Sequence, residues 1–311
     1  MAGAGIGDDG RASTLRRLDF SAADADAVVA FCLAHGSPHD GALLRRLLCT
    51  MTSDPAGVLL WGDDAGPAMA SVVIDRAVNA ARAADLELLG ARRPFGPEEL
   101  WERIIDPALA FARGGSSRAL HVSLYPWLVD SEGAERMLRG HGFLPLYQSL
   151  VMRRTGEQAI PDLPALETGW RWASLEAPRI EEAHGAIAAA FAQASSFSLS
   201  PLADFQRSIT ADPQSWQALL DGERIAGMVR AVGLGSGAGK LAMVARIPAY
   251  RGRGLGAHLV ARGLRMLAGR GARDVTLDVE AENQRALALY QSFGFRVVTR
   301  TPVLGIALRP R

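Results

Sequence analysis

The sequence predicts an α/β fold made of two similar halves. At 311 residues the chain is long for one hydrophobic core, which favours two domains. Segments with helix and strand periodicity follow one another in the same order in both halves. The motifs HGF and FGF begin at residues 141 and 293, a spacing of 152. We therefore predict an internal duplication of about 150 residues.

The C-terminal half shows the order of elements most clearly. Asp221-Gly222 lies between two apolar runs and is a strong hairpin signal. Polar and apolar residues alternate in DVTLDVE, as in a half-buried strand, and Gly294 is placed to end a helix. Strands are expected at 170–175, within 216–232, at 240–247, at 274–280 and after 294, and helices at 178–193, after 201, from 255 to about 268 and at 283–294.

The N-terminal half repeats this order less regularly. We expect a hairpin at 58–74, a helix at 97–113 with Pro97 in its first turn, a strand at 118–126, a helix at 131–143 and a strand at 144–154. Residues 155–170 hold two prolines and two glycines without a clear period, which is typical of a linker. The predicted division is a disordered tail at 1–13, domains at 14–154 and 170–311, and a linker at 155–169.

Composition limits the classes of function. Hydrophobic residues make up 49% and charged residues 22% of the chain, as in soluble globular proteins, and the net charge of +1 predicts no general attraction to nucleic acid or membrane. The two cysteines, Cys32 and Cys49, cannot form a disulfide framework for this length. No apolar run approaches the ~18 residues of a membrane span, and MAGAGIGDDGRAS lacks a signal-peptide pattern. We expect a cytoplasmic protein.

The stretch YRGRGLGAHL, residues 250–259, places two arginines and three glycines where a helix begins. Glycine costs conformational entropy, and arginine is unfavourable beside the positive end of a helix dipole. An anion bound to the uncapped N–H groups of the first helical turn would offset both costs. The segment therefore predicts a backbone cradle for a pyrophosphate, flanked by guanidinium groups.

The glycine spacing differs from that of the Walker loop and from the Rossmann Gly-x-Gly-x-x-Gly motif. It resembles the Arg/Gln-x-x-Gly-x-Gly/Ala signature of the GNAT superfamily of acetyl-CoA-dependent N-acetyltransferases, matched here by Arg251, Gly254 and Gly256. LDVEAENQRALALYQSFGF, residues 277–295, resembles the second signature of that family, an acidic strand followed by Asn-x-x-Ala-x-x-x-Tyr and then Gly-Phe. The residues in register with it are Asn283, Ala286, Tyr290, Gly294 and Phe295.

The resemblance implies two tandem GNAT-like domains, each a mixed, mostly antiparallel twisted sheet flanked by helices. Two such domains in one chain are similar to the layout of mycothiol synthases, in which the C-terminal domain is catalytic. Acetyl-CoA, the cosubstrate, would lie between the strands at 240–247 and 274–280. The cofactor-binding residues implied are Val244, Ala245, Arg246, Arg251, Gly252, Arg253, Gly254, Leu255, Gly256, Ala257, Asn283 and Tyr290.

Direct transfer of an acetyl group to an amine needs a base for the amine and an acid for the departing thiolate. Tyr290 occupies the position that the family uses for the acid; the alternative is that it only packs on the helix and hydrogen-bonds the CoA sulfur. Asp278 is the first candidate for the base, with Glu280 on the same strand face as the alternative. Either acid could instead form a structural salt bridge. Asn283 is expected to cap the helix that follows it.

Arg246 departs from the family, which usually has a small aliphatic residue two positions before the proline of the glycine loop. It either reaches the acceptor side and binds an anionic substrate, or lies along the outside of the sheet. The serines and Phe197 of SSFSLSP suggest an acceptor wall of mixed polarity. His35, His39 and Asp40 are interpreted as surface residues, so no metal site is expected.

The first half is expected to be inactive, because Glu98 and Glu99 open its equivalent helix and would repel a pyrophosphate. A shift of 152 residues places Leu138 at the position of Tyr290. The leading hypothesis is an N-acetyltransferase for a primary amine of a small molecule. The alternatives are acetylation of a protein lysine or N-terminus, and a non-catalytic acyl-CoA sensor or scaffold. The sequence does not determine the acceptor or the oligomeric state.

Overall fold

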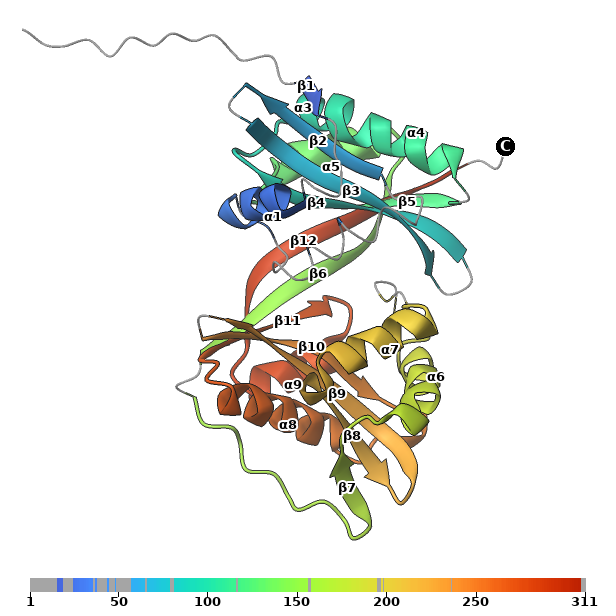
Figure 1. Ribbon diagram of the computed structural model, residues 1–311, viewed down its shortest axis with the longest axis vertical. Coiled ribbons are helices and arrows are strands. Elements are labelled where there is room, and N and C mark those ends of the chain that lie inside the picture. Colours follow the sequence, from blue (N-terminus) through green and yellow to red (C-terminus); the bar gives the residue numbers. More distant parts are fainter. Residues whose placement is uncertain are drawn as a thin grey trace, which may run out of the picture.

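The computed structural model describes residues 16–18, 25–35, 37, 44, 48, 57–64, 66–78, 81–115, 117–155, 158–194, 197, 199–235 and 237–308. The described strands form one twelve-stranded sheet in the order β1-β2-β3-β4-β5-β12-β6-β11-β10-β9-β8-β7. All neighbours in it are antiparallel except β4–β5 and β10–β11. Figure 1 shows two compact halves joined by the long diagonal strands β6 and β12.

The strands and helices of the N-terminal segment occupy the upper half of Figure 1, except β6, which runs from the upper half into the lower half. They are β1 (Arg16–Leu18), α1 (Ala25–Ala34), β2 (Gly57–Asp63), β3 (Gly66–Val78), β4 (Ala81–Ala91), α3 (Pro97–Leu100), α4 (Asp106–Gly114), β5 (Ala119–Ser123), α5 (Ser131–Gly140) and β6 (Leu144–Thr155). The helix predicted at 97–113 is interrupted by a π-helical turn, Trp101–Ile105. The sequence prediction named neither β4 nor α1.

The C-terminal segment follows the predicted order closely. Its elements are β7 (Trp170–Ala173), α6 (Ile180–Ala190), α7 (Leu202–Ala211), β8 (Trp216–Asp221), β9 (Arg224–Gly235), β10 (Ala238–Arg246), α8 (Leu255–Gly269), β11 (Asp274–Glu280), α9 (Gln284–Ser292) and β12 (Arg296–Ala307). The predicted hairpin is confirmed, with Gly222 at φ 58° between β8 and β9. Gly294 follows α9 at φ 83°.

The two halves exchange their last strands. β12, from the C-terminal segment, pairs with β5, and β6, from the N-terminal segment, pairs with β11 along all of Asp274–Glu280. β6 and β12 also pair with each other, and Ser149 meets Thr301, its own equivalent after a shift of 152 residues. The pairing is therefore symmetric about the centre of the β6–β12 ladder, as a duplicated sequence allows.

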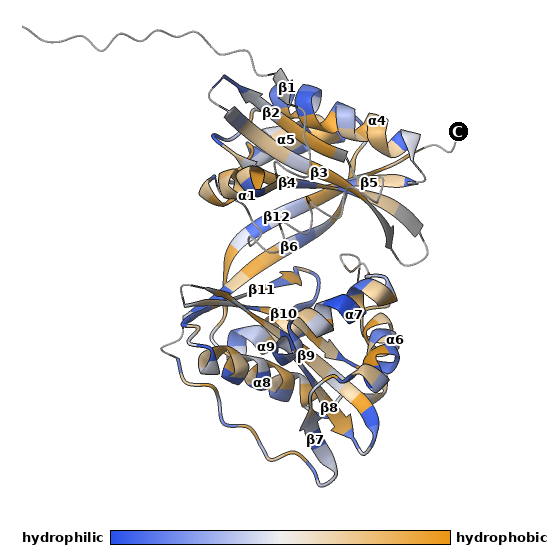
Figure 2. Ribbon diagram, viewed as in Figure 1, coloured by the Kyte–Doolittle hydropathy of each residue, from blue (hydrophilic) through white to orange (hydrophobic). Residues whose placement is uncertain are grey.

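Each exchanged strand buries apolar side chains in the opposite half. Leu304 of β12 belongs to the core of the N-terminal half, and Leu150 and Met152 of β6 belong to the core beneath α8 and α9. In Figure 2, β12 turns hydrophobic toward its end beside the upper half. The predicted domain boundaries at residues 154 and 170 stay a prediction. The packing shows that the core of each half includes a strand from the other segment. The tail at 1–13 lies outside the described residues.

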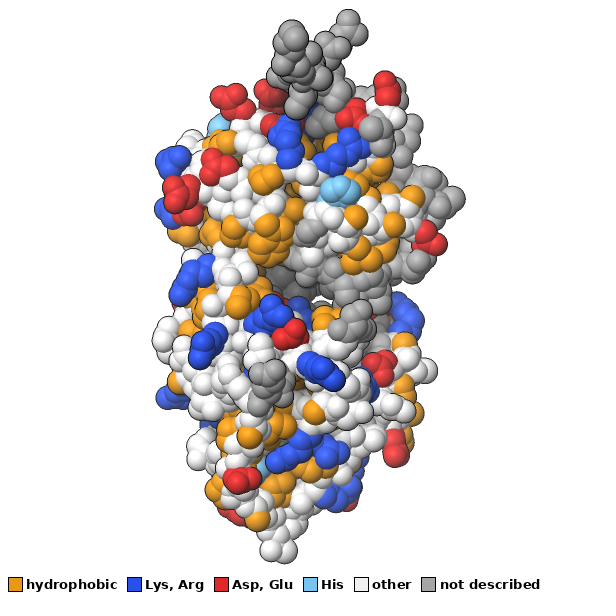
Figure 3. Space-filling view, turned by 90° about the vertical axis from the view of Figure 1, so that its left-hand side faces the viewer, with side chains coloured by type: hydrophobic (Ala, Val, Ile, Leu, Met, Phe, Trp, Pro, Cys, Tyr) orange, Lys and Arg blue, Asp and Glu red, His pale blue; other side chains and the backbone are white. Residues whose placement is uncertain are grey.

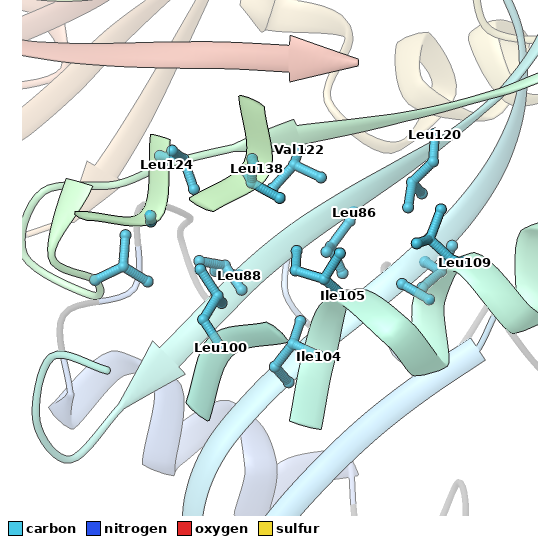
Figure 4. Packing of buried hydrophobic residues seen from close by; sticks show 14 of the residues in the cluster. Leu86, Leu88, Leu100, Ile104, Ile105, Leu109, Leu120, Val122, Leu124 and Leu138 are labelled. Atoms are coloured by element: carbon cyan, nitrogen blue, oxygen red, sulfur yellow. The ribbon is translucent and has the colours of Figure 1, made fainter. Parts of the chain in front are cut away.

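Helices cover the sheet of the upper half by burying aliphatic side chains. Figure 4 shows Leu86 and Leu88 of β4 and Leu120 and Val122 of β5 facing side chains from the α3–α4 helical segment and α5. Leu100 and Ile104 at this contact are fully buried. In the lower half, α8 and α9 pack on one face of the sheet, and α6 and α7 form a separate core with β8, β9 and β10.

Candidate active site

The glycine loop has the geometry of an open anion cradle. Gly252 and Gly254 adopt φ values of 85° and 71°, a left-handed conformation that favours glycine. Gly254 is the N-cap of α8, and no side chain caps this helix end. A Cβ on Gly252 or Gly254 would meet nothing within 4 Å. The first-turn N–H groups are therefore accessible to a ligand.

Three arginines surround this loop. Arg246 at the end of β10 is half-buried, and its buried Nε has no hydrogen-bond partner among the described residues. Burial, and then the positive charges of Arg251 and Arg285, lower the pKa of Arg246. We call Arg246, Arg251 and Arg285 the arginine cluster. No described carboxylate forms an ion pair with any of the three.

Neither predicted location of Arg246 describes its neighbourhood fully. Its charged neighbours are a loop residue and a residue of the first turn of α9, so the side chain belongs to the glycine-loop end of the sheet. Arg285 was missed by the sequence prediction. The sequence feature that could have identified Arg285 is the one used at the glycine loop: an arginine in the first turn of a helix opposes the helix dipole.

Arg253 has a different environment. Its guanidinium lies 5.9 Å from the ring centroid of Trp170 and 5.6 Å from that of Tyr250. The two rings meet edge to face at 5.6 Å. Arg253 is thus held on an aromatic pair beside the loop, a contact that the sequence pattern did not predict.

A notch opens between β10 and β11 next to this loop. The two strands run parallel and pair only as far as Lys240 and Thr276, although both continue beyond these residues. A register shift between Leu241 and Met243 marks a bulge in β10 at this point. β10 beyond the bulge ends at the glycine loop, so an elongated ligand on the loop could extend into the notch.

Tyr290 lies on α9, on the α8–α9 side of the sheet. The residue is 9% exposed, and its ring packs edge to face against that of Phe295, with 6.0 Å between the ring centroids. Burial raises the pKa of Tyr290 to about 12, so the phenol stays protonated at neutral pH. No hydrogen bond joins its hydroxyl to another described residue. Asn283 caps α9 as predicted, with Oδ1 accepting from the Ala286 N–H at 3.2 Å.

Asp278 and Glu280 lie on the opposite face of β11. Val275, Leu277 and Val279 alternate with them and are buried against α8 and α9. The Asp278 carboxylate forms an ion pair with the Lys240 ammonium. The candidate acid and the candidate bases are therefore on different faces of the sheet, and β10 and β11 are unpaired between these faces beyond Lys240 and Thr276.

The N-terminal half contributes side chains near Asp278. Tyr125, which follows β5, donates a hydrogen bond from its hydroxyl to Oε2 of Glu87 on β4 at 3.1 Å. Burial, then Glu87 and then the charge of Asp278 raise the pKa of Tyr125 well above its usual value. Figure 3 shows a hollow between the two halves and basic side chains spread over the lower half.

The equivalent loop of the N-terminal half has no cradle. Gly96, which precedes α3, has φ −70°, and Glu98 and Glu99 occupy the first turn. Glu99 pairs with Arg93 at 3.0 Å and with Arg103 at 3.6 Å. The carboxylates at this helix start thus already have arginine partners within the same half, and the absence of pyrophosphate binding there stays a prediction.

Several predicted cofactor residues can contribute only backbone. Leu255 and Ala245 direct their side chains into hydrophobic cores, and Val244 packs against the core beneath α8. A Cβ on Gly256 would lie 3.0 Å from Leu289 on α9, so glycine lets α8 start close to α9. Phe197 of the predicted acceptor wall stacks on Phe191 at 4.3 Å, and the serines at 195, 196 and 198 lie outside the described residues.

Comparison with known proteins decides the family. A model described as the acetyltransferase (GNAT) family matches residues 180–295. A mycothiol acetyltransferase of Kocuria rhizophila is 32% identical over 209 residues, covering 61% of this chain and 68% of that enzyme. The chain belongs to the GNAT family. A mycothiol acetyltransferase of Nocardioides sp. is 32% identical over 53% of this chain, and the match spans only 63% of that relative.

The tandem GNAT fold is also seen among solved structures. A tandem GNAT protein from the clavulanic acid biosynthesis pathway is 14% identical, with coverage of 96% of this chain and 99% of that chain and a TM-score of 0.68. The predicted fold class is confirmed, with the two sheets joined into one. The acyltransferase class is confirmed at the level of the GNAT family. No helix in the described part of the chain is long and apolar enough to span a membrane.

Proposed function

We propose that this GNAT protein is an acetyl-CoA-dependent N-acetyltransferase that acts through its C-terminal half on a primary amine of a small molecule. The observation that carries the proposal is the arginine cluster beside the uncapped start of α8. Like charges held close together repel, and burial of Arg246 strengthens that cost. A polyanion such as the phosphates of CoA would remove the repulsion and satisfy the free N–H groups.

The residues fit each part of such a cosubstrate. Gly252, Gly254 and the first turn of α8 would hold the pyrophosphate, with Arg251 and Arg285 beside it. The pantetheine arm would pair with the backbone of β10 along the notch. Acetyl-CoA supplies the activated acyl group when bound. The closed end of the notch, at Lys240 and Thr276, defines where the arm must stop.

Proton transfer is assigned to side chains on the two faces of the sheet. Tyr290 would protonate the departing thiolate, since burial keeps its phenol protonated well above neutral pH. Asp278, or Glu280 two residues on, would take a proton from the acceptor amine. The ion pair with Lys240 engages Asp278, so Lys240 must be displaced or change its charge before Asp278 acts alone.

The acceptor is proposed to be a small molecule on two grounds. Both relatives described above are named for mycothiol, a small molecule. Tyr125 of the N-terminal half, which is hydrogen-bonded to Glu87, also lies close enough to Asp278 to be affected by its charge, and a side chain of the other half beside the base candidate favours a small acceptor. Acetylation of a protein amine, or acyl-CoA sensing without turnover, remains an outcome of the test below.

Calorimetric titration with acetyl-CoA tests the proposal. We expect one site per chain, because only the C-terminal half has the cradle. Gly254→Ala should weaken binding about 5- to 30-fold, since holding alanine at φ 71° in the cradle costs roughly 1–2 kcal/mol, and its methyl group lies at the cradle. Gly269→Ala is the matched control, at the other end of α8, where a Cβ meets nothing within 4 Å.

Each outcome is decisive for a different part of the proposal. Two sites per chain would contradict the assignment of the first half as inactive. Absence of binding would refute the cosubstrate. Binding without turnover on any small-molecule amine, followed by turnover on peptides, would replace the acceptor class, and binding without turnover on either would support a sensor.

A further inference from the structure

Lys240 is the one lysine among the 311 residues of the chain, and the other side chains that are always positively charged at neutral pH are arginines. It lies on β10, where the pairing of β10 with β11 ends. Its side chain is 32% exposed, and its ammonium is paired with the Asp278 carboxylate, which is 46% exposed. An amine and a carboxylate that can accept its proton are thus already in contact at this point.

The Lys240–Asp278 ion pair lies at the closed end of the notch, opposite the glycine loop. A ligand that enters from the glycine loop at the end of β10 travels toward Lys240, and the β10–β11 pairing blocks further movement. The reactive end of an acetyl-CoA molecule must therefore lie near the Lys240–Asp278 pair. Tyr290 belongs to the core on the α8–α9 side of the same sheet.

We propose that Lys240 is an internal acetyl acceptor, modified by the protein itself from bound acetyl-CoA. This inference rests on the proposed cosubstrate. The modification converts the ion pair into a neutral amide beside a free carboxylate, so that Asp278 becomes available to an acceptor amine and the site gains one net negative charge. The modified site favours cationic acceptors.

The chemistry balances with the groups present. The Lys240 nitrogen forms an amide bond to the acetyl carbon, and the carbon–sulfur bond of the thioester breaks. The ammonium loses two protons in total, of which one passes to solvent by way of Asp278 and the other ends on the sulfur of the departing thiol. Because only the neutral amine attacks, the rate of modification should increase with pH.

The test uses the purified full chain incubated with acetyl-CoA, followed by trypsin digestion and mass spectrometry. Trypsin cleaves after an unmodified Lys240 but not after acetyl-lysine, so modification leaves residues 231–246 as one peptide that carries one acetyl group. We expect modification to approach one acetyl group per chain and to saturate with acetyl-CoA concentration. Protein unfolded by heat should be modified at least about 10-fold more slowly, because the oriented site is lost.

Two variants separate the roles of the paired residues. Lys240→Arg keeps a positive charge opposite Asp278 and should abolish the modified peptide. Asp278→Asn keeps the lysine and removes the proton acceptor, and should slow modification about 10-fold or more. Binding of acetyl-CoA is measured by calorimetry on the same samples.

The outcomes distinguish the inference from the function on which it rests. If acetyl-CoA binds and Lys240 remains cleavable, or if the label is found only on the N-terminal amine, the inference is wrong and the proposed function stands. Equal rates in folded and unfolded protein would also overturn it, because that modification would be non-specific. If acetyl-CoA does not bind, the proposed function fails and the inference fails with it.

Discussion

Leu304 tests the strand exchange, because it belongs to the C-terminal segment and is buried in the N-terminal half. Its side chain is fully buried, and its strand position pairs with Val122 of β5. A buried Leu→Ala substitution costs about 2–5 kcal/mol, depending on how far the cavity closes. We expect Leu304→Ala to destabilise the upper half of the molecule by about 3 kcal/mol, although the substitution lies near the C-terminus.

Hydrogen exchange measured by mass spectrometry gives the assay. A loss of about 3 kcal/mol raises the open population on the order of 100-fold, so peptides from α4 and β5 should exchange faster by that factor. Peptides from α8 should change little. Met152→Ala is the matched control, since Met152 is fully buried in the core beneath α8 and its strand position pairs with Leu277. It should show the opposite pattern.

The reasoning fails if Leu304→Ala accelerates exchange in α8 and α9 and leaves α4 and β5 protected. That result would mean that each half is completed by its own last strand. Equal acceleration in both halves would show a single cooperative unit, and would refute the expectation that the two halves open separately.

Three further predictions concern the buried titratable side chains Tyr290 and Cys32. Tyr290→Phe should reduce turnover roughly 10- to 1000-fold with acetyl-CoA affinity unchanged, measured by steady-state kinetics and calorimetry, and unchanged turnover would exclude the acid role. Because the folded-state pKa of Tyr290 is raised to about 12, its contribution to stability is complete below about pH 10 and is lost as pH rises toward 12. Denaturant unfolding of Tyr290→Phe should lack that part of the alkaline decline. Burial likewise raises the pKa of Cys32 to about 12, so peptide mapping should find Cys32 resistant to iodoacetamide at pH 8 until the protein unfolds.

Local physical chemistry explains what the sequence could predict. The glycine loop, the Asp221-Gly222 turn and the alternation in β11 each depend on neighbouring residues, and each was found where expected. The ion pair of Lys240 with Asp278 joins residues from different strands, so no spacing rule could reveal it. Arg285 was within reach of the argument used for Arg251, because it lies in the first turn of a helix, where an arginine opposes the helix dipole.

The strand exchange could not be predicted for a different reason. β6 and β12 are equivalent products of the duplication, and either could pair with β5 or with β11 without changing the hydrophobic pattern. Only the packing of particular side chains, such as Leu304 in one core and Met152 in the other, decides between the two arrangements. Pattern arguments do not resolve such a choice, because both arrangements bury the same residues.

The exchange also gives a physical reason for the inactive half to persist. β11 carries Asp278 and Glu280, and its whole length is paired with β6 from the N-terminal segment. The core that holds Tyr290 includes Leu150 and Met152 of the same strand. Without the first segment, β11 would become an exposed edge strand, and the hydrophobic core around Tyr290 would lose two apolar side chains. The half without a cradle therefore stabilises the acid and base candidates of the half that has one.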